Sequence, residues 1–211
     1  MSKVAIMNAY GVLAEPGALK FQRLMPGPAS RLWRHLTESD LRRQWLAAGK
    51  MELKVGAPVE FIWRNDELSN PPSKRPDGFP EEQRMQGRVT TFDPARKLAI
   101  DWDGFGEVSY ELEIKGSDVL LTVMQRGLPS RDIVVMFAAG SHTHFDILEA
   151  CLNGKVLPDF WKSWSRLQKD YDARIASQNL LSLVSIRGSS QTKRPRAFRP
   201  GPLIFSASHE P

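Results

Sequence analysis

Alternating apolar and polar positions in the middle of the chain predict β-strands. In three segments every second residue is apolar, and the residues between them are mostly polar. A period of two places the apolar side chains of a strand on one face. These positions are Val59, Phe61, Trp63, Leu98, Ile100, Trp102, Val108, Tyr110, Leu112 and Ile114. We therefore expect an antiparallel sheet that is covered on one face and solvated on the other.

The order of elements predicts an α+β domain. Residues 18–25 alternate as a first strand. Pro28 suits the first turn of a helix, and the capping pattern from Thr37 to Asp40 marks a second short helix. Six further strands follow, separated by turn residues. We place these strands at residues 51–55, 57–66, 84–94, 97–103, 106–116 and 117–128.

Helical periodicity returns after the strands. Residues 141–152 form one segment, which ends at Gly154. In the next segment large apolar residues recur at helical spacing, namely Phe160, Trp164, Leu167 and Tyr171. We expect this long, interrupted helical region to cover the dry face of the sheet.

A long segment without periodicity separates two of the strands. Residues 68–83 contain four prolines. Loops of this length inside a compact domain are uncommon and are often functional. We interpret the segment as a surface loop, either a lid or rim over a site or a simple insertion.

The positive charge of the chain lies mainly at its C-terminal end. Residues 177–211 carry five basic residues against one acidic residue, and so account for +4 of the formal net charge of +5. The rest of the chain is nearly neutral, which argues against specific nucleic-acid binding. We expect an N-terminal segment (1–17), one domain (18–176) and a basic tail (177–211), disordered from about residue 186.

Several protein classes are excluded by simple counts. No window approaches the roughly 18 uncharged apolar residues of a membrane span. The first 17 residues lack the pattern of a secretory signal. Cys151 is the only cysteine, so an intrachain disulfide and a multi-cysteine zinc site are impossible. We expect a cytoplasmic protein.

Residues 140–155 contain two histidines, an aspartate and a cysteine, which raises the question of a metal or nucleophile site. The periodicity favours a helix that begins at Gly140 and Ser141. Residues two apart on a helix point about 200° apart, so His142 and His144 do not chelate one ion together. We expect His144 to point inward and His142 to lie well outside the apolar face. No metal site is predicted.

Catalytic templates give no match. Cys151 lies inside the expected helix, away from the N-terminus that would lower the pKa of its thiol. The phosphate-binding and nucleophile-elbow glycine motifs are missing from the sequence. Acidic residues such as Glu60, Glu111 and Glu113 fall on the wet face of the sheet. We therefore predict no catalytic residues and no cofactor.

Large apolar side chains are abundant. The chain contains six tryptophans, and nearly all fall on apolar faces. A sheet curved around a helix often leaves inner surface that the helix does not fill, and such a gap is the usual form of a small-molecule site. The alternative is that the tryptophans simply fill the core.

Several segments resemble a known family. RLMPGPASRLWRHLTESDLRRQWL, VEFIWRND, GRVTTFDPARKLAIDWD, VSYELEI, DVLLTVMQRGLPSRD and AAGSHTHFDIL are similar to the heat-shock-protein-90 ATPase activator-like family, a branch of the START and birch-pollen-allergen superfamily (SRPBCC). The resemblance covers about residues 18–175. It implies a helix-grip fold, in which a curved seven-stranded antiparallel sheet wraps around a long C-terminal helix. Relatives often have Trp-His where this chain has Ser141-His142, and Thr-His where it has Met124-Gln125.

The resemblance leaves three hypotheses. In the first, the protein binds a small hydrophobic molecule in an apolar cavity lined by Trp63, Trp102, Tyr110, Met124, His144 and Leu148. In the second, it regulates a chaperone or another protein partner through its outer surface, as eukaryotic members of the family do. In the third, it is a cyclase- or hydrolase-like enzyme that uses His144 or Tyr110 as acid or base. We rank them in that order. The sequence does not indicate an oligomeric state.

Overall fold

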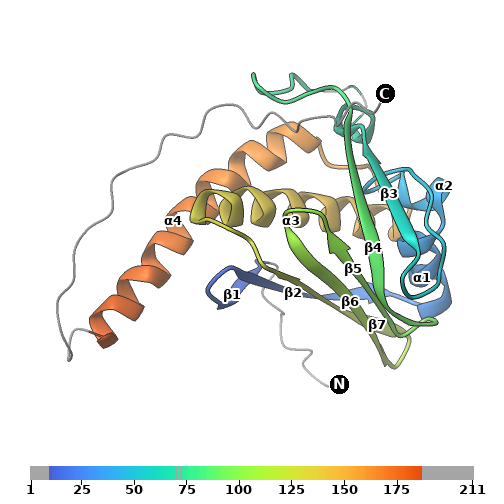
Figure 1. The fold of residues 1–211 in the computed structure, drawn as a ribbon. Helices are drawn as coiled ribbons and strands as arrows, with labels where there is room; N and C mark the ends of the chain where they lie inside the picture. The colour runs from blue at the N-terminus through green and yellow to red at the C-terminus, as the bar shows by residue number, and fades with distance from the viewer. Residues whose placement is uncertain (1–9, 70, 72, 187–211) are drawn as a thin grey trace, which may run out of the picture.

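The computed structural model of the chain describes residues 10–69, 71 and 73–186. In this part of the chain seven strands form one antiparallel sheet in the order β1-β2-β7-β6-β5-β4-β3. They are β1 (Val12–Glu15), β2 (Ala18–Pro26), β3 (Pro58–Trp63), β4 (Gln83–Asp93), β5 (Lys97–Trp102), β6 (Gly106–Lys115) and β7 (Asp118–Arg126). The α+β architecture with a curved seven-stranded sheet is confirmed (Figure 1).

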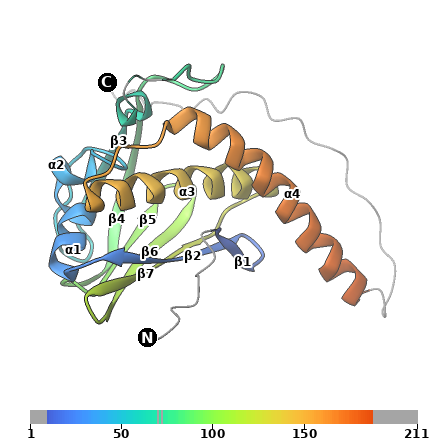
Figure 2. The same ribbon diagram turned by 180° about the vertical axis from the view of Figure 1, so that it is seen from behind.

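The helices form two further layers. The short helices α1 (Ala29–Thr37) and α2 (Ser39–Arg42) follow β2 and lie at one end of the sheet. The long helix α3 (Arg131–Asn153) lies across the inner face of the sheet, and α4 (Phe160–Ile186) packs on α3 and projects beyond the sheet (Figure 1, Figure 2). The sheet therefore grips α3, and α4 forms an outer layer.

The face of the sheet that was predicted to be dry is buried, with one exception. Val59, Phe61, Leu98 and Ile100 are almost completely inaccessible to solvent. Ile114 is 71% exposed, because it lies one residue from the end of β6, beyond the covering helices. The alternation of Ile114 with its polar neighbours predicts the correct secondary structure, but alternation does not reveal how far along the strand the face stays covered.

The strands differ from the prediction at two places. Residues 51–55 do not form a strand: Met51 pairs with Val59 as an isolated bridge, and the chain then turns at Gly56, whose φ is 86°. The seventh strand is β1, which precedes the predicted first strand. Its residues are mostly exposed, so it lacks the buried alternation by which strands are recognised in a sequence.

Helix α3 begins ten residues earlier than predicted. The hydroxyl of Ser130 accepts a hydrogen bond from the backbone N–H of Ile133 and caps the helix. Gly140 therefore lies inside the helix and does not start it. The predicted end at Gly154 is confirmed, since Gly154 adopts the left-handed conformation that closes a helix. The early turns were missed because they are apolar with little periodicity, as expected for a helix packed between two layers.

A buried arginine organises the loop that follows α2. Arg42 is only 1% exposed, and its guanidinium donates hydrogen bonds to the carbonyl oxygens of Thr37 (3.0 Å), Ala47 (3.1 Å) and Gly49 (2.6 Å). The side chain also lies over the ring of Phe61, 5.2 Å from its centroid. These contacts fix the turn that carries Trp45 into the core.

The C-terminal helix continues past the predicted domain end. Residues 177–186, which were assigned to the tail, are helical as the last part of α4. The disordered segment predicted from about residue 186 lies almost wholly outside the described residues. In the part of the chain that the structure describes, no helix has the length and apolar character needed to cross a membrane.

Candidate functional site

A cavity of about 150 Å3 lies between the inner face of the sheet and the two long helices. Its closed end is formed by buried rings, among them Phe21, Trp45 and Phe145. Half-buried residues such as Met85 and Phe105 form its mouth. More than half of the lining residues are phenylalanine, tryptophan or tyrosine, and none of those described is Asp, Glu, Lys or Arg. The wall is therefore aromatic and uncharged.

Four of the six residues predicted for the cavity lie in its wall. Trp63 and Trp102 end β3 and β5, and Tyr110 lies in the middle of β6. His144 reaches the cavity from the middle of α3. These elements are distant in sequence, and the curvature of the sheet brings them together.

Met124 and Leu148 do not line the cavity. The buried positions of β7 are the odd-numbered ones, such as Val123, so Met124 lies on the outer face of the sheet. Leu148 is completely buried but lies one turn beyond His144, in the core away from the cavity. Placing these two side chains in the cavity wall was wrong.

The sequence prediction missed five polar or small residues in the wall, namely Asn65, Gln83, Gln125, Gly140 and Ser141. Gln125 is inward-facing on β7, and its amide nitrogen donates to the carbonyl oxygen of Phe105 at 2.7 Å. Gly140 and Ser141 line the cavity from α3. The period-two pattern of β7 would have identified Gln125. Ser141 was noted only as a small residue at a position where relatives often have tryptophan.

His144 presents a hydrogen-bond acceptor to the cavity. Its Nδ1 lies 2.6 Å from the carbonyl oxygen of Trp45. A carbonyl oxygen only accepts, so the proton of the neutral ring is on Nδ1, and Nε2 carries a lone pair. Burial lowers the pKa of His144 to about 4, although the bond to Trp45 acts in the opposite direction. The ring is therefore neutral near pH 7.

Two further polar atoms of the wall are buried and have no hydrogen-bond partner within the described part of the chain. They are the indole Nε1 of Trp102 and the amide Oδ1 of Asn65. Asn65 begins a short 3-10 helix, η1 (Asn65–Leu68), directly after β3. One atom donates and the other accepts, but both are covered by neighbouring protein atoms and do not face the open space of the cavity.

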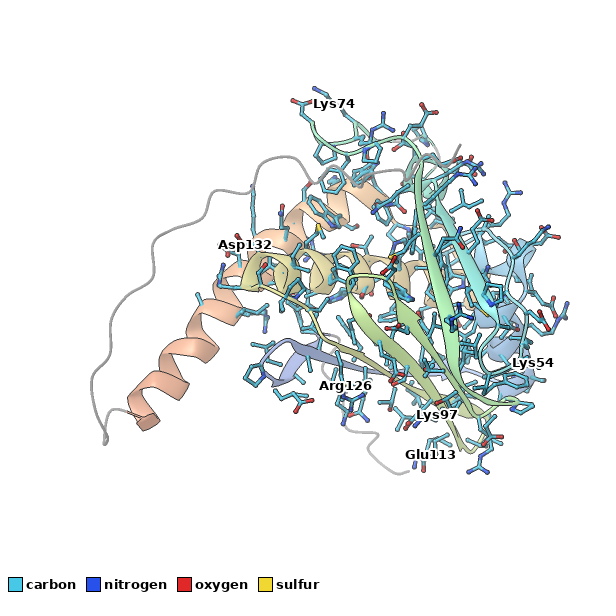
Figure 3. All side chains as sticks on the ribbon, in the orientation of Figure 1. Lys54, Lys74, Lys97, Glu113, Arg126 and Asp132 are labelled. Carbon is cyan, nitrogen blue, oxygen red and sulfur yellow. The ribbon has the colours of Figure 1, made fainter. Side chains whose placement is uncertain are left out.

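Phe79 of the proline-rich loop lines the cavity, so the loop forms part of the cavity wall. We call its described part, residues 73–82, the strap. The ring of Phe79 packs on those of Trp161 (5.3 Å) and Trp164 (4.9 Å), and all three residues line the cavity. Lys74, also on the strap, points outward into solvent (Figure 3).

The strap is held by polar contacts at its base. Asp66 accepts hydrogen bonds from Arg75 of the strap and from the indole of Trp161 on α4, each at 2.7 Å. The hydroxyl of Ser73 donates to Asp159, which precedes α4. These contacts fasten the strap, η1 and the start of α4 to one another.

His142 is buried, contrary to the prediction. It was placed outside the apolar face, but α4 covers this second side of α3, so His142 is only 4% exposed. Its Nδ1 lies 3.0 Å from the hydroxyl of Tyr171, and its Nε2 lies 3.6 Å from Asp146, which also pairs with Arg23 at 3.2 Å. Burial, together with the nearby Arg23, lowers the pKa of His142 to about 3.

The site has little capacity for acid–base or nucleophilic chemistry. Burial raises the pKa of Tyr110, against a smaller opposing effect of Arg42, so its hydroxyl stays protonated. Burial also raises the pKa of the Cys151 thiol, which donates to the carbonyl oxygen of Gln44 at 3.6 Å outside the cavity. Within the described residues, no group of three His, Cys, Asp or Glu side chains is arranged to hold a metal ion.

A curved antiparallel sheet that grips a helix and leaves an apolar cavity beneath it defines the helix-grip class of SRPBCC-like proteins. The chain belongs to the family described as Activator of Hsp90 ATPase homolog 1-like protein, whose sequence profile matches residues 26–153. The resemblance stated from the sequence is thereby confirmed.

Solved structures agree with this assignment. A protein from Bordetella parapertussis, determined by solution NMR, is 28% identical to the chain; the match covers 82% of this chain and 94% of that one, with a TM-score of 0.68. The crystal structure of CalU16 from Micromonospora echinospora is 18% identical over 74% of this chain and 86% of that one (TM-score 0.54). DynU16, from the dynemicin biosynthetic locus, is 18% identical over 69% of this chain and 51% of that one (TM-score 0.53). At 18% identity these two share the fold alone. None of the curated proteins compared with the chain matches it in sequence.

Proposed function

We propose that the protein binds a small hydrophobic molecule in the cavity between its sheet and its long helices. The observation that supports this most directly is a wall of aromatic side chains around a cavity of about 150 Å3, with the polar residues Gln125, Ser141 and His144 placed among them. Small-molecule sites are typically apolar pockets with a few placed polar groups. An engineered apolar cavity of similar size binds benzene.

The two alternative functions have less support. Regulation of a chaperone through the outer surface calls for a contiguous exposed apolar patch. The large apolar side chains that are exposed in the described part of the chain, Val12, Val55, Ile114 and Val156, belong to four separate segments. A cyclase or hydrolase needs an acid, base or nucleophile beside the substrate, and the described lining residues carry no charge.

Native mass spectrometry tests the proposal. The protein would be purified gently from its own host and measured intact, and then again after denaturation. We expect an apolar molecule to be released in an amount close to that of the protein. An empty protein that also fails to take up a fluorescent hydrophobic probe would contradict the proposal, and the partner-surface hypothesis would then rank first.

A further inference from the structure

One nitrogen of His144 opens onto the cavity. The side chain lines the cavity and is 7% exposed. Within the described residues, the hydrogen bond of its ring is the one from Nδ1 to the carbonyl oxygen of Trp45, which leaves Nε2 unpaired. The unpaired side-chain atoms that are fully covered in this part of the chain belong to Arg23, Asn65 and Trp102, and Nε2 is not among them. Nε2 is therefore accessible, and the open space that His144 borders is the cavity.

The ring of His144 is held on two sides. Nδ1 lies 2.6 Å from the carbonyl oxygen of Trp45, and the ring packs on that of Phe160 with a centroid separation of 5.0 Å. Because Nδ1 is directed at the backbone of Trp45, Nε2 at the tip of the imidazole is directed away from it. A rotation that offered Nε2 a partner elsewhere would leave a buried carbonyl oxygen unpaired, which is costly.

The protonation state of the ring determines which group can bind to it. Burial lowers the pKa of His144 to about 4, so Nε2 carries a lone pair near pH 7 and only accepts. A carbonyl or ether oxygen placed against it would oppose one lone pair to another, whereas an O–H or N–H group completes the bond. A water molecule can do so in the empty protein, and a ligand that displaces this water has to replace its bond.

The rest of the wall requires the donor to be uncharged. The described lining residues include no acidic or basic side chain. An ammonium group would lose its hydration in the cavity without gaining a carboxylate, which is strongly unfavourable. A hydroxyl or a neutral N–H group meets both conditions.

The size and shape of the ligand follow from the volume and the rings. A cavity of about 150 Å3 accommodates one six-membered ring with a small substituent. Flat rings such as Trp63, Phe137 and Trp164 favour a flat partner, because aromatic pairs gain energy from offset-stacked and edge-to-face contacts.

We infer that the ligand is an uncharged single-ring molecule with a hydroxyl or neutral N–H group that donates a hydrogen bond to Nε2 of His144. Aromatic alcohols and phenols have this chemistry. The inference rests on the proposed function, since it assumes that the cavity binds a small molecule. It assigns to His144 the choice between molecules of equal size.

Three probes with the same number of heavy atoms test this inference. Benzyl alcohol has a donor, anisole has only an acceptor, and ethylbenzene has neither. Affinities would be measured by titration calorimetry or ligand-observed NMR on the full chain. In His144→Phe, which keeps a ring but removes the acceptor, we expect an affinity for benzyl alcohol lower by about tenfold. The affinities for anisole and ethylbenzene should stay within about threefold, since neither molecule uses Nε2.

Tyr110→Phe is the matched control. Tyr110 lines the same cavity, and the change removes one polar group from the wall while the ring is kept. The affinity for benzyl alcohol should stay within about threefold of the original. A loss in this variant comparable to that in His144→Phe is expected only if any polar group of the wall serves equally well, and it would contradict the specific role of His144.

A measurement on the original protein covers the case in which His144→Phe fails to fold. The 15N resonance of Nε2 should move toward that of a protonated nitrogen when benzyl alcohol binds. Anisole and ethylbenzene should leave it unchanged. The ring nitrogens of His142, which is not part of the cavity wall, provide an internal reference.

The outcomes separate the inference from the proposed function. If the probes bind but respond alike to His144→Phe, or if benzyl alcohol binds without moving the Nε2 resonance, the inference is overturned and the proposed function stands. A failure of all three probes to bind, even at millimolar concentration, would overturn both.

Discussion

The hydroxyl of Tyr171 lies 3.0 Å from Nδ1 of His142 and joins α4 to the middle of α3. The same hydroxyl accepts a hydrogen bond from the backbone N–H of Gly11 at 2.7 Å. Its own proton is therefore free to be donated to His142, which places the proton of the neutral histidine on Nε2, toward Asp146. One phenol thus connects two helices and the segment before β1.

Removal of this hydroxyl should loosen all three segments. In Tyr171→Phe the N–H of Gly11 and Nδ1 of His142 lose their partner while the ring is kept. We expect a loss of about 1–3 kcal/mol in the free energy of unfolding and faster hydrogen exchange at the Gly11 amide. Denaturant unfolding and amide exchange by NMR measure the two effects. Tyr10→Phe, which removes a half-buried bond to Asp170, is the control and should cost less.

Acidification should destabilise the protein through its two buried histidines. Their folded-state pKa values, about 3 for His142 and about 4 for His144, lie below the ordinary value of 6.5. The unfolded chain therefore takes up protons first, so this stability is complete above about pH 6.5 and is lost as the pH falls toward 4.

The size of the effect can be checked by denaturant unfolding at two pH values. Between about pH 7.5 and about pH 5.5 the two histidines together should lower the free energy of unfolding by about 3 kcal/mol. The pKa of Asp146, raised by burial, acts in the opposite direction because its protonation favours the folded state. A His142→Gln, His144→Gln double variant should show a much flatter profile. An unchanged stability of the original protein over this interval would contradict the buried neutral state of both rings.

Arg42 should be far more important to stability than its neighbour Arg43. Arg42→Met leaves three carbonyl oxygens without a donor, so we expect a loss of about 3 kcal/mol or more. Burial lowers the pKa of Arg42 to about 10, so the group remains charged in the folded protein near pH 7. Arg43 and its partner Glu67 are each 53% exposed and lie 3.5 Å apart. Arg43→Met should change stability by about 0.5 kcal/mol or less, and urea unfolding of both variants provides the comparison.

Ser141 should control the space available to a ligand. An indole side chain at this position would project into the cavity, since Ser141 is part of its wall. We expect Ser141→Trp to abolish uptake of ethylbenzene while the protein stays folded, and Ser141→Ala to bind it as before. Circular dichroism verifies folding, and calorimetry measures binding. Unchanged uptake by the tryptophan variant would mean that hydrophobic molecules bind elsewhere.

The parts of the fold that were predictable are those that follow from local pattern. The alternation of apolar and polar residues predicts strands with one buried face, such as the strand that contains Phe61. The conformational freedom of glycine predicts the end of the helix at Gly154. β1 was missed because its side chains are mostly exposed, and only Leu13 among them packs against the core. The early turns of α3 were missed because burial on two sides removes the helical period.

Local sequence pattern also predicts part of the site. Trp63, Trp102 and Tyr110 follow from strand alternation, which assigns a face to each residue. Met124 was misplaced because its apolar character was given more weight than its position in the alternation. The burial of His142 and the packing of Phe79 on α4 depend on contacts between segments far apart in the chain, and such contacts leave no local signal.

The fastening of the strap at Asp66 makes one part of the cavity wall depend on a loop. The sheet and α3 supply wall residues from regular elements, whereas Phe79 is supplied by the strap and packs on Trp161 and Trp164 of α4. Asp66 bonds both to Arg75 of the strap and to Trp161, so a single carboxylate positions rings on two sides of this contact. A substitution of Asp66 would therefore alter the shape of the cavity although its side chain is not part of the wall.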